Sequence, residues 1–110
     1  CDIHPVNNLR VRQYLTREMN ADEGQSARWY SHWIEIGFAA VERLLSAEGP
    51  YACGPGPTLA DVVLVPQVAN ARRFAVPLDA YPRIVRADAA ARALPAFADA
   101  APDRQPDFGA

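Results

Sequence analysis

The sequence predicts an all-α fold. Half of the 110 residues are hydrophobic, many of them alanine, and the residues that favour strands are concentrated in one short run at positions 62–65. Two long stretches place apolar residues at nearly helical spacing, and Gly- and Pro-rich segments separate the remaining parts of the chain. A chain of this length suits a single core. We therefore expect one helical domain over residues 1–110.

The first helix is expected over residues 6–19. Its apolar residues recur at nearly helical spacing, and Pro5 suits an early helical position. The polar stretch 20–26 follows and contains Gly24. That composition predicts a connection between two helices.

A second helix is expected to begin at Ser26, which can cap it, and to stop at Gly49 and Pro50. One face is apolar and is expected to be buried, while the other carries charged residues. The expected buried face holds Trp29, Trp33, Phe38, Val41, Leu44 and Leu45, and the charged face holds Arg28, Glu35, Glu42 and Arg43. The three aromatic residues are interpreted as core or domain-interface residues.

A third helix is expected after the Gly- and Pro-rich loop 49–57. Thr58 and Asp61 fit a capping box, in which each residue satisfies a backbone group at the start of the helix. We therefore interpret both as structural residues. The first half of this helix is apolar on nearly every side, which predicts a central helix enclosed by others, and Pro66 predicts a kink.

A fourth helix is expected from Pro82, which suits the first helical position, to a stop at Pro95. A short helical turn is expected after it. The Pro-rich, polar segment 102–110 is expected to form an extended tail.

The composition argues against two classes of partner. The net charge is −2, and all eleven basic residues are arginine. Because there is no excess of cations to neutralise phosphates, we expect neither a nucleic acid nor a membrane surface as partner. No apolar stretch approaches the roughly 20 residues of a membrane span. A cytoplasmic protein is expected.

The cysteines predict no disulfide framework and no zinc site. Cys1 and Cys53 are the only two, and they are far apart. We expect no metal site in this chain. Because the chain begins with Cys rather than Met, we expect it to be a fragment of a longer protein.

Three stretches carry a resemblance to a known family. They are HPVNNLRV at 4–11, TLADVVLVPQVANARRF at 58–74, and RQPD at 104–107. In order and spacing, over essentially the whole chain, they resemble the C-terminal helical domain of zeta-class glutathione transferases, the family of maleylacetoacetate and maleylpyruvate isomerases. The TLAD box alone recurs across the wider transferase superfamily, whereas LVPQVANARRF is much more specific.

The resemblance implies a division of labour between two domains. In the family, a thioredoxin-like N-terminal domain supplies the serine that polarises the sulfur of glutathione, so no catalytic residue is expected in this chain and the chain alone is expected to be inactive. The family reaction adds glutathione to a cis double bond, allows rotation and then eliminates glutathione. The cofactor is therefore glutathione, the substrate is a small diacid, and the longer protein is expected to be a homodimer.

The resemblance also implies binding residues. The glutathione-binding residues are expected to be His4, Asn8, Leu9 and Arg10, and the substrate-binding residues Arg73 and Arg10. An Asn side chain can donate to and accept from a peptide-like ligand, and an Arg side chain can make charge-assisted bonds to a carboxylate. Arg72 is the alternative to Arg73, because consecutive helical residues point about 100° apart. Arg73 matches the family position.

Two other functions stay open at this point. The chain could belong to a general glutathione-conjugating enzyme, or it could be a non-catalytic helical module used for protein association. The expected cleft arginines favour the isomerase, because an association module does not need to bind a diacid. Arg12 departs from the family pattern, which usually has an aliphatic residue there.

Overall fold

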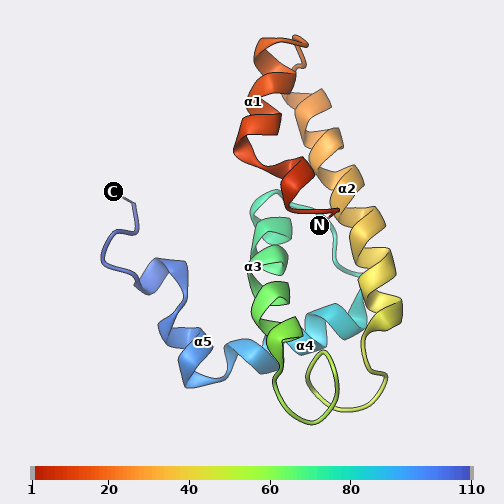
Figure 1. Cartoon of the computed structure of the whole chain (residues 1–110), viewed down its shortest axis with the longest axis vertical. Coiled ribbons are helices and arrows are strands. Elements are labelled where there is room, and N and C mark those ends of the chain that lie inside the picture. The colour runs from red at the N-terminus through yellow and green to blue at the C-terminus, as the bar shows by residue number, and fades with distance from the viewer. Residues whose placement is uncertain (1, 110) are drawn as a thin grey trace.

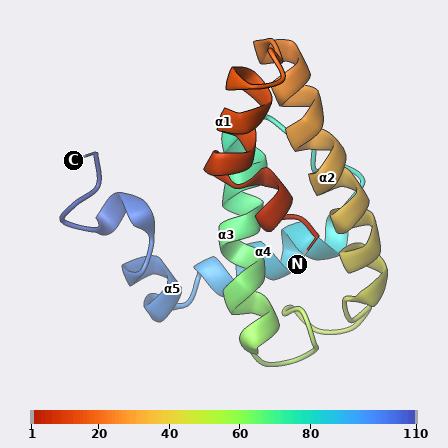
Figure 2. The same ribbon diagram turned by 45° about the horizontal axis from the view of Figure 1, so that its top comes forward.

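The computed structural model describes residues 2–109, and every regular element in that range is helical (Figure 1; Figure 2). The elements are η1 (Pro5–Asn7), α1 (Leu9–Arg17), α2 (Glu23–Leu44), α3 (Leu59–Arg73), α4 (Pro82–Arg92), α5 (Pro95–Asp99) and η2 (Pro102–Arg104), where η marks a 3-10 helix. The expected all-α fold is confirmed.

The core lies where α2, α3 and α4 meet. In Figure 1, α1 lies alongside the first half of α2, α4 crosses at the other end of the bundle, and α5 with the C-terminal segment extends to one side. The buried hydrophobic residues form one cluster: Tyr30, Ile34, Phe38, Leu45, Ala52, Leu64, Val68, Ala71, Val76, Tyr81, Ile84 and Ala87. Burial of this cluster is the main favourable term in folding the domain.

The first helical stretch is two pieces rather than one helix over 6–19. Asn8 separates η1 from α1, with a ψ of 150° that breaks the helical path. Its side chain accepts the backbone N–H of Arg10 at 3.2 Å and so caps α1. The segment before η1 lies against α2 at Gly37, where any Cβ would collide with Ile3. Glycine at that position therefore lets the N-terminal segment approach α2 closely.

The start predicted for the second helix is wrong by several residues. Asp22 caps α2 by accepting the N–H of Gln25 at 2.7 Å, and Gln25 accepts the N–H of Asp22 at 2.8 Å. This reciprocal pair satisfies two backbone groups, so the helix begins before Ser26. Ser26 is buried inside the helix, and Gly24 belongs to its first turn rather than to a connection.

The end and the buried face of α2 also differ from the prediction. The helix ends at Leu44, before Gly49 and Pro50, because the backbone of Leu45 is extended. The buried positions of the helix are Ser26, Tyr30, Ile34 and Phe38, while Trp29 and Trp33 are only half-buried and Leu44 is 84% exposed. These four buried residues recur at every fourth position, which is close to the helical period, so they share one face of α2. The two tryptophans lie beside that face.

The start of α3 agrees with the prediction. Asp61 is fully buried and accepts the backbone N–H of Thr58 and of Ala52, each at 2.8 Å. One carboxylate therefore ties the loop before α3 to the first turn of the helix. The Thr58 hydroxyl donates to the same carboxylate at 3.2 Å.

The expectation that α3 is enclosed by other helices is wrong within the described residues. Leu59, Val62 and Val63 are 75%, 52% and 64% exposed. Among the described residues, Val62 shares a pocket with Ala96 and Phe97 of α5, and this contact covers it only in part. Pro66 lies inside the helix, and the kink expected there stays a prediction.

The fourth helix begins at Pro82, as predicted, and its first turn is held by α2. The carboxylate of Glu42 accepts the backbone N–H of Arg83 at 2.8 Å and of Ile84 at 2.9 Å. Glu42 is therefore half-buried at a contact between two helices rather than on a solvated face. The positive end of the helix dipole, at the start of α4, stabilises a carboxylate at this position.

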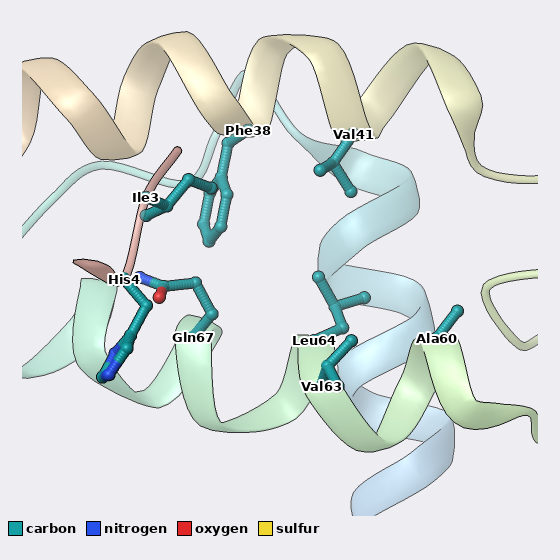
Figure 3. A pocket seen from close by; sticks show the side chains of 8 residues that line it. All are labelled: Ile3, His4, Phe38, Val41, Ala60, Val63, Leu64 and Gln67. Atoms are coloured by element: carbon teal, nitrogen blue, oxygen red, sulfur yellow. The ribbon is translucent and has the colours of Figure 1, made fainter. Parts of the chain in front are cut away.

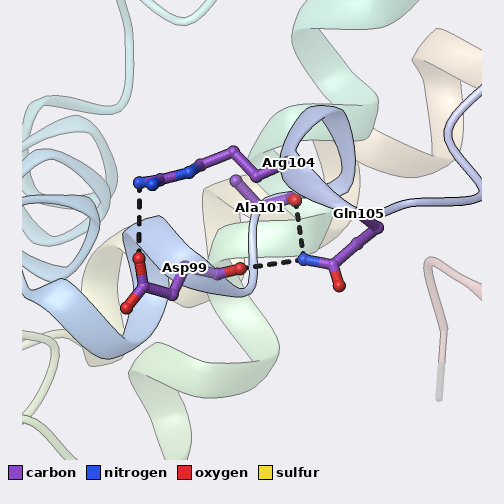
Figure 4. A network of polar contacts seen from close by, with 4 residues as sticks. All are labelled: Asp99, Ala101, Arg104 and Gln105. Atoms are coloured by element: carbon purple, nitrogen blue, oxygen red, sulfur yellow. Dashed lines mark hydrogen bonds and ion pairs between the residues drawn. The ribbon is translucent and has the colours of Figure 1, made fainter.

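The C-terminal segment is folded on itself rather than fully extended (Figure 4). The side-chain amide of Gln105 donates to the carbonyls of Asp99 at 2.8 Å and Ala101 at 3.1 Å, and Arg104 pairs with Asp99 at 3.3 Å. These contacts close the turn around η2. Residues 102–109 are exposed, and residue 110 lies outside the described part of the chain.

Candidate functional site

A polar hollow of about 330 Å³ opens between η1, α1, α2 and α3. It is lined by His4, Asn7, Asn8, Leu9, Arg12, Tyr30, Gln67, Asn70, Arg73 and Phe74. These residues include two arginines and no carboxylate. The hollow therefore suits a ligand that carries negative charge and hydrogen-bonding groups.

The break between η1 and α1 forms one wall of the hollow. Asn7 is 7% exposed, and its Nδ2 donates to the carbonyl of Tyr30 at 3.1 Å. Its Oδ1 is buried and has no hydrogen-bonding partner. A buried acceptor without a partner is costly, so Asn7 offers an acceptor for a ligand's N–H group.

Asn8 and His4 differ in their burial and in their hydrogen bonds to the rest of the chain. Asn8 is half-buried and caps α1, which leaves its side-chain amide N–H groups for another partner. His4 is exposed, and its ring makes no capping hydrogen bond to η1. Leu9 is exposed at the start of α1.

The two consecutive arginines in the last turn of α3 lie in different surroundings. Arg73 lines the hollow. Arg72 instead pairs with the buried carboxylate of Asp88 on α4, with 2.7 Å between Nη1 and Oδ2. The geometry therefore leaves Arg73 available to a ligand and engages Arg72 in the contact between helices.

Two aromatic rings in contact, tilted by 37° to each other, line the hollow. The ring centroids of Tyr30 and Phe74 lie 3.9 Å apart. The guanidinium of Arg12 lies 4.6 Å from the Phe74 centroid and 5.3 Å from the Tyr30 centroid, and that of Arg73 lies 5.8 Å from the Phe74 centroid. Both cations thus share one aromatic surface, where cation–π attraction holds them.

Burial raises the pKa of Tyr30 above its usual value of 10.0, and the positive charges of Arg12 and Arg73 oppose this rise. Desolvation disfavours the phenolate, whereas nearby cations favour it. The influence of both guanidiniums on one hydroxyl agrees with their convergence on the hollow.

A second, apolar pocket of about 380 Å³ adjoins the hollow (Figure 3). It is lined by Ile3, His4, Phe38, Val41, Ala60, Val63, Leu64 and Gln67. Phe38 and Val41 point from α2 toward Leu64 and Gln67 on α3. His4 and Gln67 line both cavities, so the polar hollow continues into an apolar region.

The structure brings together most of the residues predicted to bind ligands, but not all. His4, Asn8, Leu9 and Arg73 all line the hollow. Arg10 is exposed on the first turn of α1 and is not among the lining residues. The roles of all five stay predictions.

Six lining residues of the hollow were not among the predicted binding residues: Asn7, Arg12, Tyr30, Gln67, Asn70 and Phe74. One signal was available for Arg12, because it lies four residues after Asn8 and therefore on the same face of α1. Tyr30 and Phe74 come from different helices, and their contact depends on how α2 and α3 pack. No pattern in the sequence predicts that contact.

Other kinds of site receive no support within residues 2–109. No group of three or more His, Cys, Asp or Glu side chains there could hold a metal ion. Cys53 is exposed and free, and Cys1 lies outside the described residues. No helix among these residues is both long and apolar enough to cross a membrane.

Comparisons with known proteins agree on one family. The chain is 51% identical to the maleylpyruvate isomerase of Ralstonia sp, over 97% of this chain and 52% of that protein. It is 50% identical to a probable maleylacetoacetate isomerase of Vibrio cholerae, over 96% of this chain and 50% of the relative. The chain spans about half the length of the curated relatives it matches. No protein-family model matches it.

Solved structures show the same relationship in the fold. The holo structure of a maleylpyruvate isomerase, described as a bacterial zeta-class glutathione transferase, superposes with a TM-score of 0.95 at 50% identity. That match covers 99% of this chain and 53% of the solved chain. A maleylpyruvate isomerase from Pseudomonas aeruginosa PAO1 superposes with a TM-score of 0.92 at 44% identity, over 98% of this chain and 58% of the other. By sequence and by fold, this chain belongs to the zeta class of the glutathione transferase family and corresponds to about half of such a protein.

Proposed function

We propose that this chain is the C-terminal helical domain of a glutathione-dependent cis–trans isomerase that acts on maleylacetoacetate or maleylpyruvate in the degradation of aromatic compounds. The observation that carries the proposal is the polar hollow, which offers Arg73 and the unpaired amide oxygen of Asn7 and has no carboxylate in its lining. Its supporting context is about 50% identity to isomerases of both substrates.

The hollow fits glutathione as well as a diacid. Asn7 provides a buried acceptor without a partner, and Asn8 provides amide donors, so both suit the peptide groups of a tripeptide. A solved maleylacetoacetate isomerase that matches this chain at 40% identity contains glutathione in its active site. When bound, glutathione supplies the thiol that adds to the double bond and leaves it again. His4, Asn8, Leu9 and Arg10 are the proposed residues that hold it.

The proposed work of this domain is to bind and orient, not to activate the thiol. The guanidinium of Arg73 can form two parallel bonds to one carboxylate, which fixes both the position and the direction of the substrate. The adjoining pocket offers a mostly apolar lining to the part of the ligand that carries no charge. The residue that activates sulfur is proposed to lie in a thioredoxin-like domain of the longer protein, which we propose to be a cytoplasmic homodimer.

The test is a comparison of two reactions in the full-length parent protein. One is glutathione-dependent isomerisation of maleylpyruvate or maleylacetoacetate, and the other is glutathione conjugation of an uncharged acceptor. We expect efficient isomerisation of at least one diacid. A protein that conjugates the uncharged acceptor but isomerises neither diacid would instead be a general conjugating enzyme, and a protein with neither activity would be an association module.

A further inference from the structure

Arg12 is the least expected residue of the polar hollow. It lies on α1, between Asn8 and the aromatic pair, and it lines the hollow together with Arg73. It is half-buried, and its Nε is buried without a hydrogen-bonding partner. A planar donor of this kind is costly to leave unsatisfied, so its position is explained best by a partner that the fold itself does not provide.

The surroundings of Arg12 hold its cation in place without neutralising it. Its guanidinium lies against the faces of Phe74 and Tyr30, at 4.6 and 5.3 Å from their centroids. Aromatic faces attract a guanidinium but leave its edge N–H groups free. No ion pair of Arg12 occurs among the described residues, whereas Arg72, Arg92 and Arg104 are all paired with carboxylates.

Arg12 and Arg73 bring two positive charges to the hollow, and no carboxylate in its lining neutralises them. Both guanidiniums lie within 6 Å of the same ring, that of Phe74, and no carboxylate lines the hollow. A ligand with two negative groups compensates both cations best, because each guanidinium can then pair with one of those groups. A ligand with one carboxylate leaves one cation uncompensated.

We propose that Arg12 is a second carboxylate-binding residue, which together with Arg73 makes the hollow selective for dianionic ligands over monoanionic ones. This inference rests on the proposed function, since it assigns the second carboxylate of the diacid to a residue of this chain. Arg12 sets specificity here, and Arg73 alone would bind a single carboxylate.

The test uses two unreactive probes of equal carbon number, succinate with two carboxylates and butyrate with one. Their dissociation constants are measured by calorimetry on the full-length parent protein at low salt, without glutathione, so that the result does not depend on turnover. We expect the unmodified protein to bind succinate at least tenfold more tightly than butyrate. Equal affinity for the two probes would overturn the proposal without any variant.

Three variants then assign the preference to its residues. Arg12→Met keeps an unbranched stem against the aromatic rings but removes the charge, and we expect it to lose the preference for succinate. Arg12→Lys keeps the charge and should retain part of it. Arg17→Met is the matched control, because Arg17 is exposed in the last turn of the same helix and lies outside the hollow.

The outcomes separate this inference from the proposed function. An unchanged preference in Arg12→Met would show that Arg12 only packs against Tyr30 and Phe74, and it would overturn the inference. A protein that prefers succinate through Arg12 but isomerises neither diacid would support the inference and contradict the proposed function.

Discussion

Nη1 of Arg72 lies 2.7 Å from Oδ2 of Asp88 and joins the last turn of α3 to the middle of α4. The Asp88 side chain is fully buried, while that of Arg72 is 39% exposed. Arg92 lies 3.5 Å from the same carboxylate oxygen. Because the next residue, Arg73, lines the hollow, the two consecutive arginines lie in different surroundings: one at the contact between helices and one at the candidate site.

Loss of Arg72 should lower stability rather than impair isomerisation. Arg72→Met leaves the buried carboxylate of Asp88 with the weaker contact to Arg92 alone, and an underpaired buried charge is costly. Because Arg72 is partly exposed, we expect a loss of about 1 to 3 kcal/mol in the free energy of unfolding, measured by denaturant titration of the full-length protein.

Arg43→Met is the matched control, since Arg43 is exposed in the last turn of α2. It should leave the unfolding midpoint unchanged. If Arg72→Met unfolds at the same denaturant concentration as this control, the ion pair contributes nothing to stability.

Asp61→Ala should destabilise the domain by about 2 to 3 kcal/mol, because it removes a fully buried cap and leaves the N–H groups of Thr58 and Ala52 without an acceptor. The measurement is again denaturant titration, with Asp79→Ala as an exposed control. Turnover per folded molecule should not change. A variant that unfolds normally but has lost turnover would show that Asp61 acts in the chemistry.

Stability should fall at high pH. Burial raises the pKa of Tyr30, so the folded protein holds the phenolic proton more tightly than the unfolded chain does. The stabilisation is therefore fully present below the unfolded value of about 10 and is lost as pH rises through the higher folded value. Burial raises the pKa of Tyr81 as well, and its effect has the same sign.

The check is the free energy of unfolding measured between pH 8 and pH 11. Tyr30→Phe should make the decline above pH 10 less steep, and Tyr14→Phe, at a residue that is 60% exposed, should not. An identical decline in Tyr30→Phe and in the unmodified protein would refute the assignment.

The parts of the fold that follow from local signals could be predicted. The Thr58–Asp61 box and the prolines at 82 and 95 mark helix boundaries through short-range physics, and all three lie where the sequence indicates. The start of α2 was missed because Asp22 and Ser26 both can cap, and only the reciprocal bond to Gln25 decides between them. The spacing of Asp22 and Gln25 is itself a capping-box pattern, so this start was available from the sequence but was not used.

Burial was predicted less well than helicity, because it depends on which neighbours are present. Val62 and Val63 are apolar but exposed, since the described elements cover their side of α3 only in part. For the candidate site, the family resemblance identified Arg73 and Asn8, which do line the hollow. It gave no reason to expect Arg12 there, because that residue departs from the family pattern.

The most direct test of the account is the catalytic efficiency of Arg73→Ala in the full-length parent protein, with the diacid and with an uncharged glutathione acceptor. A lost charge-assisted hydrogen bond of about 1.5 to 3 kcal/mol corresponds to a drop of about ten- to a hundredfold in kcat/KM. We expect that drop for maleylpyruvate or maleylacetoacetate and no change for the uncharged acceptor, which has no carboxylate to lose. An equal loss with both substrates, or no loss with the diacid, would contradict the claim that the polar hollow binds the substrate's carboxylate through Arg73.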